Sequence, residues 1–576
     1  MIVQRFLLIV SVMLLTALAA SGQEKNAAPV SAGRAGADDV CDILHLAESG
    51  PLLLRLHIRL DGRSYRSVWQ EQFTQMFRDF DEDNSGVLEP PEAARIGNPK
   101  QLRDAGLISW TSAPLPAITP DANPRDGKVT KNELETFYRK IGGGPLVLHV
   151  ANTSGARSPQ RLTAQSERLW RLLDLDRNGK LSKVELQAAG KLLSKLDVND
   201  DDIISDDELR GPQADILSLS VNTSSDVSVD QQTGSRDPVF VDLGEVAPDE
   251  LAGQLLEFYD GRDATGDRAD KPAARDEKLS PREINVSRET FKRLDVDANG
   301  QLDTGELGKI ATLLPPMLEV ILRMGKKKPS QKRIELVPLK TARPTTIIST
   351  SRRGFPSVEV GGVQLTWTVS SRGTGSTDRV TDGFRQQFAA LDKDKNKYLE
   401  SNEVANAYYF RNAFKLIDHD GDGKILEKEL LTFVEREMAA SSSRMQIYFY
   451  LEGRSLFKLL DRNADRRLAV REIANAPGWL LHWDHNADGQ ISIAEVPIHV
   501  SVPVQPVSLY GRTYFLDGAF AYDKPPDSTR GPLWFRKMDR NQDGDLSPRE
   551  FLGPIDEFKK FDSDDDGLID ATEAGK

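Results

Sequence analysis

Ten twelve-residue segments of this chain place oxygen-bearing side chains at a fixed spacing. Each begins with Asp, carries Asp, Asn or Ser at positions 3 and 5, and ends with Glu at position 12. Side chains at these positions, together with the backbone carbonyl of position 7, surround a hard cation with oxygen, and the final Glu contributes both of its oxygens. Calcium suits such a flexible, carboxylate-rich turn better than magnesium, which keeps more of its water. The spacing therefore predicts calcium sites.

Seven of these segments also have glycine at position 6, where the chain must bend sharply. Their predicted ligands are Asp81, Asp83, Ser85, Val87, Glu92; Asp174, Asp176, Asn178, Lys180, Glu185; Asp295, Asp297, Asn299, Gln301, Glu306; Asp418, Asp420, Asp422, Lys424, Glu429; Asp484, Asn486, Asp488, Gln490, Glu495; Asp539, Asn541, Asp543, Asp545, Glu550; and Asp562, Asp564, Asp566, Leu568, Glu573. The residue at position 7 contributes its carbonyl oxygen.

Three segments keep the oxygen ligands but lack the glycine, having Asp202, Lys397 and Arg466 in its place. Their predicted ligands are Asp197, Asn199, Asp201, Ile203, Glu208; Asp392, Asp394, Asn396, Tyr398, Glu403; and Asp461, Asn463, Asp465, Arg467, Glu472. A left-handed bend at Lys or Arg costs on the order of 1 kcal/mol, so we expect these sites to bind calcium more weakly. Asp tolerates the bend better, so the Asp197 loop should be weakened least.

Two further segments are irregular versions of the pattern. The segment from Asp121 to Glu133 looks like a loop with one extra residue. The segment from Asp260 to Glu283 has a regular end but carries a polar insertion, Gly261 to Arg275. The sequence leaves open whether either one binds calcium.

Apolar residues at helical spacing precede several loops, as Trp69, Phe73, Phe77 and Phe80 precede Asp81. Helix, twelve-residue loop and helix together resemble the EF-hand superfamily. The chain is similar to secreted bacterial proteins with many EF-hand pairs, and its compact loop pairs partly resemble dockerin modules. The resemblance covers most of the chain from about Leu52 onward. It implies Ca²⁺ as the cofactor and a fold that is mainly α: tandem EF-hand pairs with short interspersed β-strands, in two tandem halves.

Loops that are neighbours in the sequence are expected to pair, because the residue at position 8 of each loop bridges to its partner. Asp174 would pair with Asp197, and Asp461 with Asp484. The segment Leu52 to Asp83 also aligns without gaps onto Val363 to Asp394, which suggests a duplication. We expect a signal peptide at 1–22, a linker at 23–50, a basic linker at 326–356, and pairs with their strands at 51–144, 145–213, 214–325, 357–440, 441–496 and 497–576.

Short runs with alternating apolar residues lie between the pairs and predict strands. They are Leu146 to Val150, Ile216 to Val221, Val239 to Leu243, Val358 to Val369, and Ile498 to Leu509. We expect these strands to pair with one another into small sheets that hold the loop pairs together. The alternative is a sheet edge that recognises a partner strand.

The N-terminus predicts export. Arg5 precedes an apolar run, Phe6 to Ala20, and small residues follow it, as in a signal peptide. The run is shorter than a membrane span, and no later segment is apolar enough for one. A secreted, periplasmic or cell-surface protein with one cysteine, Cys41, cannot form an internal disulfide, so metal is the expected source of stability. The net charge of -13 argues against nucleic acid as a partner.

The chain lacks the catalytic motifs that sequence can reveal, such as a His-Glu-x-x-His pair or a Gly-x-Ser-x-Gly elbow, so we expect no enzyme. The leading hypothesis is a calcium-stapled structural or interaction protein, with a protein or cell-surface partner still unidentified. One alternative is a calcium sensor or buffer. Another is a calcium-dependent extracellular hydrolase whose site the sequence does not reveal.

Overall fold

The fold is given by a computed structural model that describes residues 39–105, 107–108, 118–121, 125–152, 166, 168–193, 195–205, 208–209, 239–261, 276–325, 331–338, 348–350, 355–369, 377–461, 467–484, 486–507 and 530–575. The predicted signal peptide, most of the first linker, the predicted strand Ile216 to Val221 and the ligands Asn463 and Asp465 lie outside these residues. So do most of the insertion after Gly261 and part of the basic linker. The elements below belong to one unit that begins at Asp39.

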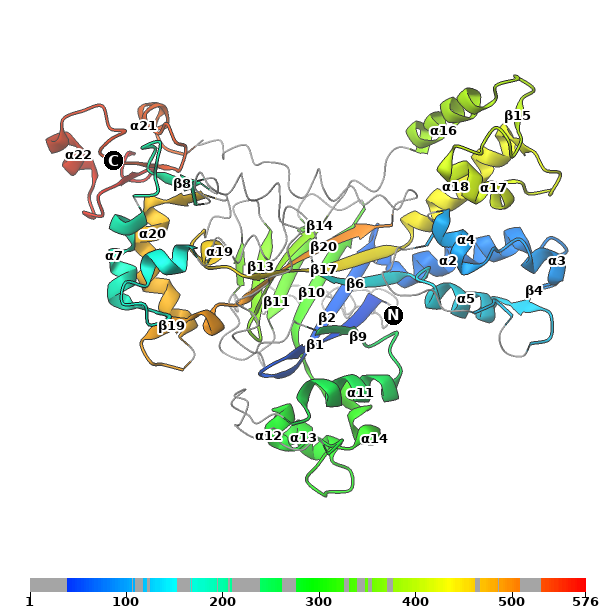
Figure 1. Cartoon of the computed structure of the whole chain (residues 1–576), viewed down its shortest axis with the longest axis horizontal. Helices are drawn as coiled ribbons and strands as arrows, with labels where there is room; N and C mark the ends of the chain where they lie inside the picture. The colour runs from blue at the N-terminus through cyan, green and yellow to red at the C-terminus, as the bar shows by residue number, and fades with distance from the viewer. Residues whose placement is uncertain are drawn as a thin grey trace, which may run out of the picture. The chain divides into compact units, whose positions relative to one another are not determined.

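Two six-stranded sheets form the centre of this unit (Figure 1). The first has the order β11-β10-β2-β1-β9, and β3 pairs with β2. Its strands are β1 (Val40–Ala47), β2 (Gly50–Leu60), β3 (Arg63–Ser64), β9 (Val239–Asp242), β10 (Pro316–Met324) and β11 (Ile334–Pro338). β1 and β2 form an antiparallel hairpin, whereas β10 runs parallel to β2.

The second sheet has the order β12-β13-β14-β20-β17-β6. Its strands are β6 (Leu146–Asn152), β12 (Ile348–Thr350), β13 (Pro356–Val360), β14 (Val363–Val369), β17 (Met445–Arg454) and β20 (Ile498–Pro506). β13 and β14 form a hairpin, and β14 runs parallel to β20 as β2 runs parallel to β10. The aligned segments of the sequence repeat thus have the same place in their sheets.

Apolar side chains from both sheets form one continuous core. They alternate along the strands, as successive residues of a strand point to opposite faces. Leu54 and Leu56 of β2, Trp367 of β14 and Phe449 of β17 are all buried in it. The ring of Phe449 stacks on Phe240 of β9 with centroids 4.1 Å apart, which joins the second sheet to the first.

The prediction of a mainly α fold was therefore wrong. Strands expected to be short and interspersed instead pair over long distances into two large sheets. Several had been assigned elsewhere: β1 to a linker, β11 and β12 to the basic linker, and β17 to an EF-hand pair. The expected tandem arrangement of the halves fails as well, because β6 from the first half pairs in parallel with β17 from the second.

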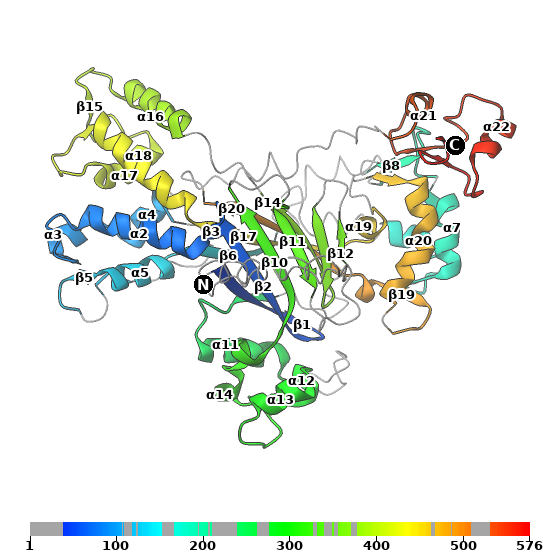
Figure 2. The ribbon, with the colours of Figure 1, turned by 180° about the vertical axis from the view of Figure 1, so that it is seen from behind.

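The helices pack in clusters outside the central core. One cluster joins α2 (Tyr65–Phe80), α4 (Pro99–Asp104) and α5 (Lys131–Lys140) to α16 (Thr377–Leu391), α17 (Tyr408–Ile417) and α18 (Glu427–Ser442). Another joins α7 (Lys183–Leu193) to α19 (Leu456–Leu460) and α20 (Val470–Leu480). α7 and α20 contact each other and lie side by side in both views (Figures 1 and 2). Elements of the two halves thus share their cores.

Two smaller clusters contain further helices. The first contains α11 (Pro248–Tyr259), α12 (Pro281–Ile284), α13 (Arg288–Leu294), α14 (Thr304–Leu307) and α15 (Ile310–Leu313), packed on β1 and β9. The second contains α21 (Leu533–Met538) and α22 (Ile555–Phe561). Among the described residues, no helix combines the length and apolar character that crossing a bilayer requires.

Candidate metal centres

The Asp81 loop illustrates how the sequence builds each centre. Helix α2 ends at Phe80, and the Asp81 amide closes its last turn on the Phe77 carbonyl. After the turn come strand β4 (Val87–Leu88) and the short helix α3 (Pro90–Ala93). Helix, loop and helix thus follow one another as the sequence predicted, and the short strand β4 lies inside the loop.

Backbone amides hold the Asp81 loop in its curve. Asp81 Oδ1 accepts a hydrogen bond from the Ser85 amide at 2.9 Å, and Oδ2 accepts one from the Gly86 amide at 3.0 Å. Glu92 closes the loop, because its two oxygens accept from the Glu82 amide at 2.8 Å and the Glu89 amide at 2.9 Å. The loop is therefore arranged by its own first and last carboxylates.

The predicted ligands converge in several loops. Each of five groups has three carboxylate oxygens within 4.8 Å of one another: Asp81, Asp83, Glu92; Asp174, Asp176, Glu185; Asp295, Asp297, Glu306; Asp392, Asp394, Glu403; and Asp418, Asp420, Asp422. Oxygens 2.3–2.6 Å from one calcium ion lie about this far apart. Four position-1 residues have buried carboxylate oxygens that lack a hydrogen-bond partner: Asp121 Oδ1, Asp260 Oδ1, Asp418 Oδ1 and both oxygens of Asp539. Calcium would supply the missing positive partner, so the donor set fits this ion.

Two positions of the loop have left-handed backbone. Gly86 at position 6 has φ +83°, as the sequence predicted, and the substitutes Asp202 and Lys397 are forced to +63° and +71°. Position 4 is left-handed too, as in Asn84 with φ +56°, and this was missed. Asn, Asp or Gly at position 4 in four loops was the available signal: Asn84, Asp200, Gly421 and Asp565.

The remaining predicted sites are placed in the same way. In each of the loops that begin at Asp197, Asp484 and Asp562, the first Asp accepts from the amides of positions 5 and 6, and the last Glu accepts from an amide early in the loop. In the Asp461 loop, Asp461 is buried and Glu472 accepts from the Ala469 amide at 3.2 Å.

Both irregular segments close like the regular loops. Asp121 Oδ2 accepts from the Gly127 amide at 3.1 Å, and Asp260 Oδ2 accepts from the Glu277 amide at 3.1 Å. Glu283 Oε1 accepts from the Gly261 amide at 3.1 Å. The insertion between Asp260 and Glu283 thus leaves the two ends of that loop in contact.

Position-8 residues face one another across short antiparallel strands, and this reveals which loops are partners. Leu88 of β4 faces Val129 of β5 (Val129–Thr130), which pairs the Asp81 and Asp121 loops. β15 (Tyr398–Leu399) pairs with β16 (Ile425–Leu426), β21 (Asp545–Leu546) pairs with β22 (Ile569–Asp570), and Leu279 bridges to Leu302. These four pairs join loops that are neighbours in the sequence.

The other four loops exchange partners. Leu181 of β7 (Lys180–Ser182) faces Ile491 of β19 (Gln490–Ser492), which pairs the Asp174 loop with the Asp484 loop. Ile204 of β8 (Ile203–Ser205) faces Leu468 of β18 (Arg467–Ala469), which pairs the Asp197 loop with the Asp461 loop. Both pairs join the two halves of the chain. They differ from the pairing of neighbours that the sequence suggested.

Three segments match the EF hand. A family model described as EF hand matches residues 288–311, 410–434 and 533–552, which contain the whole of the Asp295, Asp418 and Asp539 loops. The match supports EF-hand character and calcium binding at these positions. Comparison with curated proteins and with solved structures finds no significant match.

The Asp539 EF hand has an unusual electrostatic environment. Asp539, Asp545 and Glu550 are buried, and burial raises the pKa of all three carboxyls. Burial also raises the pKa of Asp543 to about 7. In the Asp484 loop, by contrast, the exposed Asp488 has a lowered pKa, first because of its hydrogen bond to Lys180. Burial therefore disfavours the charged form of the Asp539 loop carboxyls, whereas the hydrogen bond to Lys180 favours the charged form of Asp488.

Proposed function

We propose that the chain is an exported protein in which calcium acts as a structural staple, and that its role is structural or interactive rather than catalytic. The observation that carries the proposal is the exchange of partners among the Asp174, Asp197, Asp461 and Asp484 loops. An ion bound in one of these loops stabilises a contact with a segment from the other half of the chain. Calcium would thereby contribute to the tertiary fold and not only to one helix pair.

Charge supports a stapling role. Five loops each gather three carboxylates in a small volume, and six of the acidic residues at position 1 are buried. Without a cation, like charges at these distances repel one another. Binding that occurs only in the folded state stabilises the fold by mass action, so calcium should raise stability progressively with its concentration.

Export is supported by the N-terminal pattern of Arg5 followed by an apolar run. Outside the cell, calcium at millimolar concentration fills even sites with dissociation constants of roughly 10⁻⁴ M. The ions would then be permanent parts of the structure. A sensor, by contrast, needs tighter sites that empty and fill with signalling.

The test is calcium titration of chelator-stripped protein by calorimetry, with thermal unfolding followed by circular dichroism at each calcium concentration. The staple requires many sites of weak to moderate affinity and a melting temperature that rises throughout the titration. A few submicromolar sites on a protein that is already fully folded without calcium would favour the sensor or buffer. Absence of calcium-linked heat would contradict calcium binding itself.

A further inference from the structure

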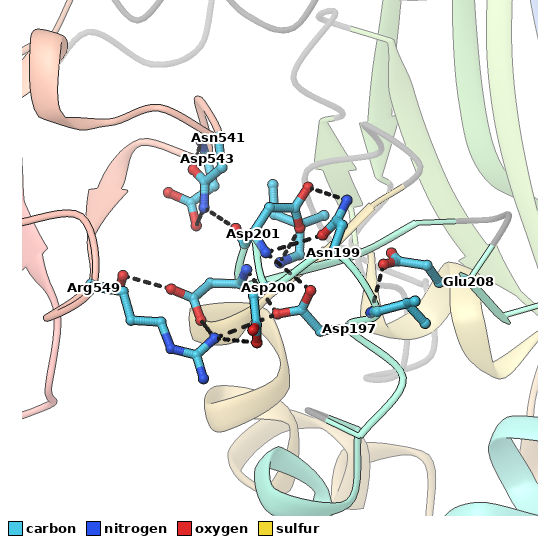
Figure 3. Close-up of polar contacts among 12 residues, drawn as sticks. Asp197, Asn199, Asp200, Asp201, Glu208, Asn541, Asp543 and Arg549 are labelled. Atoms are coloured by element: carbon cyan, nitrogen blue, oxygen red, sulfur yellow. Dashed lines mark hydrogen bonds and ion pairs between the residues drawn. The ribbon is translucent and has the colours of Figure 1, made fainter.

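The Asp539 loop lies against the Asp197 loop, although these loops are not an EF-hand pair (Figure 3). Asn541 Nδ2 donates to the Asp201 carbonyl at 2.8 Å across 340 residues of sequence. Asn541 Oδ1 accepts from the Asp543 amide at 3.0 Å within its own loop. The predicted ligand Asn541 is thus held by the backbone of a second metal loop.

Asp202 makes the most buried polar contact between the two loops. Its Oδ2 accepts a hydrogen bond from Ser547 Oγ at 2.6 Å, and the Asp202 side chain is only 15% exposed. In three other loops the position-9 serine donates instead to the Glu of its own loop: Ser182 to Glu185, Ser205 to Glu208, and Ser492 to Glu495. The Ser547 hydroxyl therefore donates to Asp202 of another loop, where the other three serines donate to the Glu at position 12 of their own loop.

Arginines neutralise the acidic groups at this contact. Arg549 lies 3.1 Å from both Asp200 Oδ1 and Asp202 Oδ1. Arg467 of the Asp461 loop donates to the Asn541 carbonyl at 2.8 Å. Arg471 bridges two carboxylates of the C-terminal pair, Asp545 Oδ2 at 2.8 Å and Asp566 Oδ2 at 2.6 Å. Both loops of the C-terminal pair are therefore connected to the Asp197 and Asp461 pair.

We propose that the C-terminal loop pair (Asp539 and Asp562) docks on the Asp197 and Asp461 pair through a calcium-coupled interface, with Asp202 and Arg549 as docking residues. Docking buries carboxylates of the Asp539 loop beside a second acidic loop, which is costly while that loop carries unneutralised charge. A bound calcium ion removes this cost, so calcium favours docking. By linkage, docking must favour calcium binding to the same extent.

Asp202 is unfavourable for the geometry of its own loop but favourable for docking. At φ +63°, glycine would relieve backbone strain at this position, so a loop considered alone should bind calcium better with glycine. If the two loops dock, the same substitution should weaken calcium binding by the neighbouring Asp539 loop. Asp202→Gly removes the hydrogen bond from Ser547 and the contact with Arg549. The two interpretations thus predict different effects of one substitution.

The experiment measures hydrogen exchange by mass spectrometry in the full chain over a series of calcium concentrations. Docking predicts that Asp202→Gly raises the calcium concentration for half-maximal protection of residues 539–550 by roughly tenfold, as expected for loss of a charge-assisted hydrogen bond. Arg549→Gln, which removes no ligand of either loop, should shift it in the same direction. The matched control Lys397→Gly removes a left-handed side chain at the same loop position, and should alter protection of residues 392–403 only.

A midpoint for residues 539–550 that stays within twofold of wild type in Asp202→Gly would overturn the docking proposal. An equal shift in Lys397→Gly would also overturn it, because the effect would then not depend on the interface. The proposal rests on calcium binding by these loops. If no loop of the wild-type chain is protected by calcium, both calcium binding and docking are overturned. If the wild-type loops are protected but the Asp202→Gly midpoint does not shift, only docking is overturned.

Discussion

Leu181 and Ile491 lie opposite each other in an antiparallel pair of strands, although each belongs to a different half of the chain. Both are buried at position 8 of their loops, where a calcium-binding loop meets its partner. Beside them, Lys180 forms an ion pair with Asp488 across 308 residues of sequence. This contact makes the Asp174 and Asp484 loops one structural unit.

Removing the last ligand of one loop should therefore loosen a segment far away in the sequence. Glu495→Gln removes the bidentate charge of the Asp484 loop, and we expect at least a tenfold loss of calcium affinity there. Hydrogen exchange should then increase in β7 as well as in β19. The exposed Glu557→Gln is the matched control and should leave both strands protected. Loss of protection at β18 instead of β7 would indicate that neighbours in the sequence pair after all.

The ion pair offers a direct chemical test of the same contact. Lys180 Nζ lies 2.5 Å from Asp488 Oδ2, close enough for a carbodiimide to join them without a spacer. Mass spectrometry of the monomer treated without calcium, when no ion shields the Asp488 carboxyl, should identify a peptide that links these two residues. Lys180→Arg keeps the charge but cannot form the amide, so this variant should lose the product. If the wild-type product is also absent, the exchanged pairing is wrong.

The sheet core should be as important for stability as the metal loops. Phe449 is fully buried and stacks on Phe240 of the other sheet, so Phe449→Ala leaves a cavity between the sheets. Such truncations cost about 3–5 kcal/mol. Urea unfolding in saturating calcium should reveal this loss. Tyr408→Ala, at a side chain that is 58% exposed, should cost far less. Equal effects would contradict a shared core.

Acid should destabilise the first sheet through His45. Burial lowers the pKa of His45 to about 4 from an ordinary value of 6.5, so the folded protein holds this ring neutral. Above pH 6.5 the ring is neutral in both the folded and the unfolded protein. As the pH falls from 6.5 toward 4, only the unfolded protein takes up the proton, and the free energy of unfolding falls by on the order of 3 kcal/mol. His45→Phe should flatten the dependence of unfolding free energy on pH at fixed saturating calcium. The exposed His419→Phe should not. Superimposable curves for wild type and His45→Phe would contradict this assignment.

The metal loops could be located from the sequence because each one is local. Asp81 and Glu92 belong to the same twelve residues, and their carboxylates accept hydrogen bonds from amides of that segment. The pairing of loops could not be deduced in the same way. Leu181, Ile204, Leu468 and Ile491 are all aliphatic residues at position 8, so local sequence permits either arrangement. All four residues lie beside helices of both halves that share one apolar core, and these contacts are distant in sequence.

The sheets were underestimated for a related reason. β6, β9, β14 and β20 have alternating patterns that predict strands, but alternation does not name the neighbouring strand. β17, rich in Tyr and Phe, directly follows a helix and was assigned to an EF-hand pair. The proposed docking role of Asp202 could not be predicted from the sequence either, because its partner Ser547 is distant in the sequence.

The pairing of loops between the two halves also limits how early the protein can finish folding. Leu181 emerges from the ribosome long before its partner Ile491 exists, so the first half must wait with an aliphatic surface uncovered. Contacts between segments so distant in sequence form slowly, because a long chain must close first. A fragment that ends before Gln490 would therefore lack the strand that pairs with the Asp174 loop, whatever the calcium concentration. The first half of this chain can therefore complete its fold only after the second half has been synthesised.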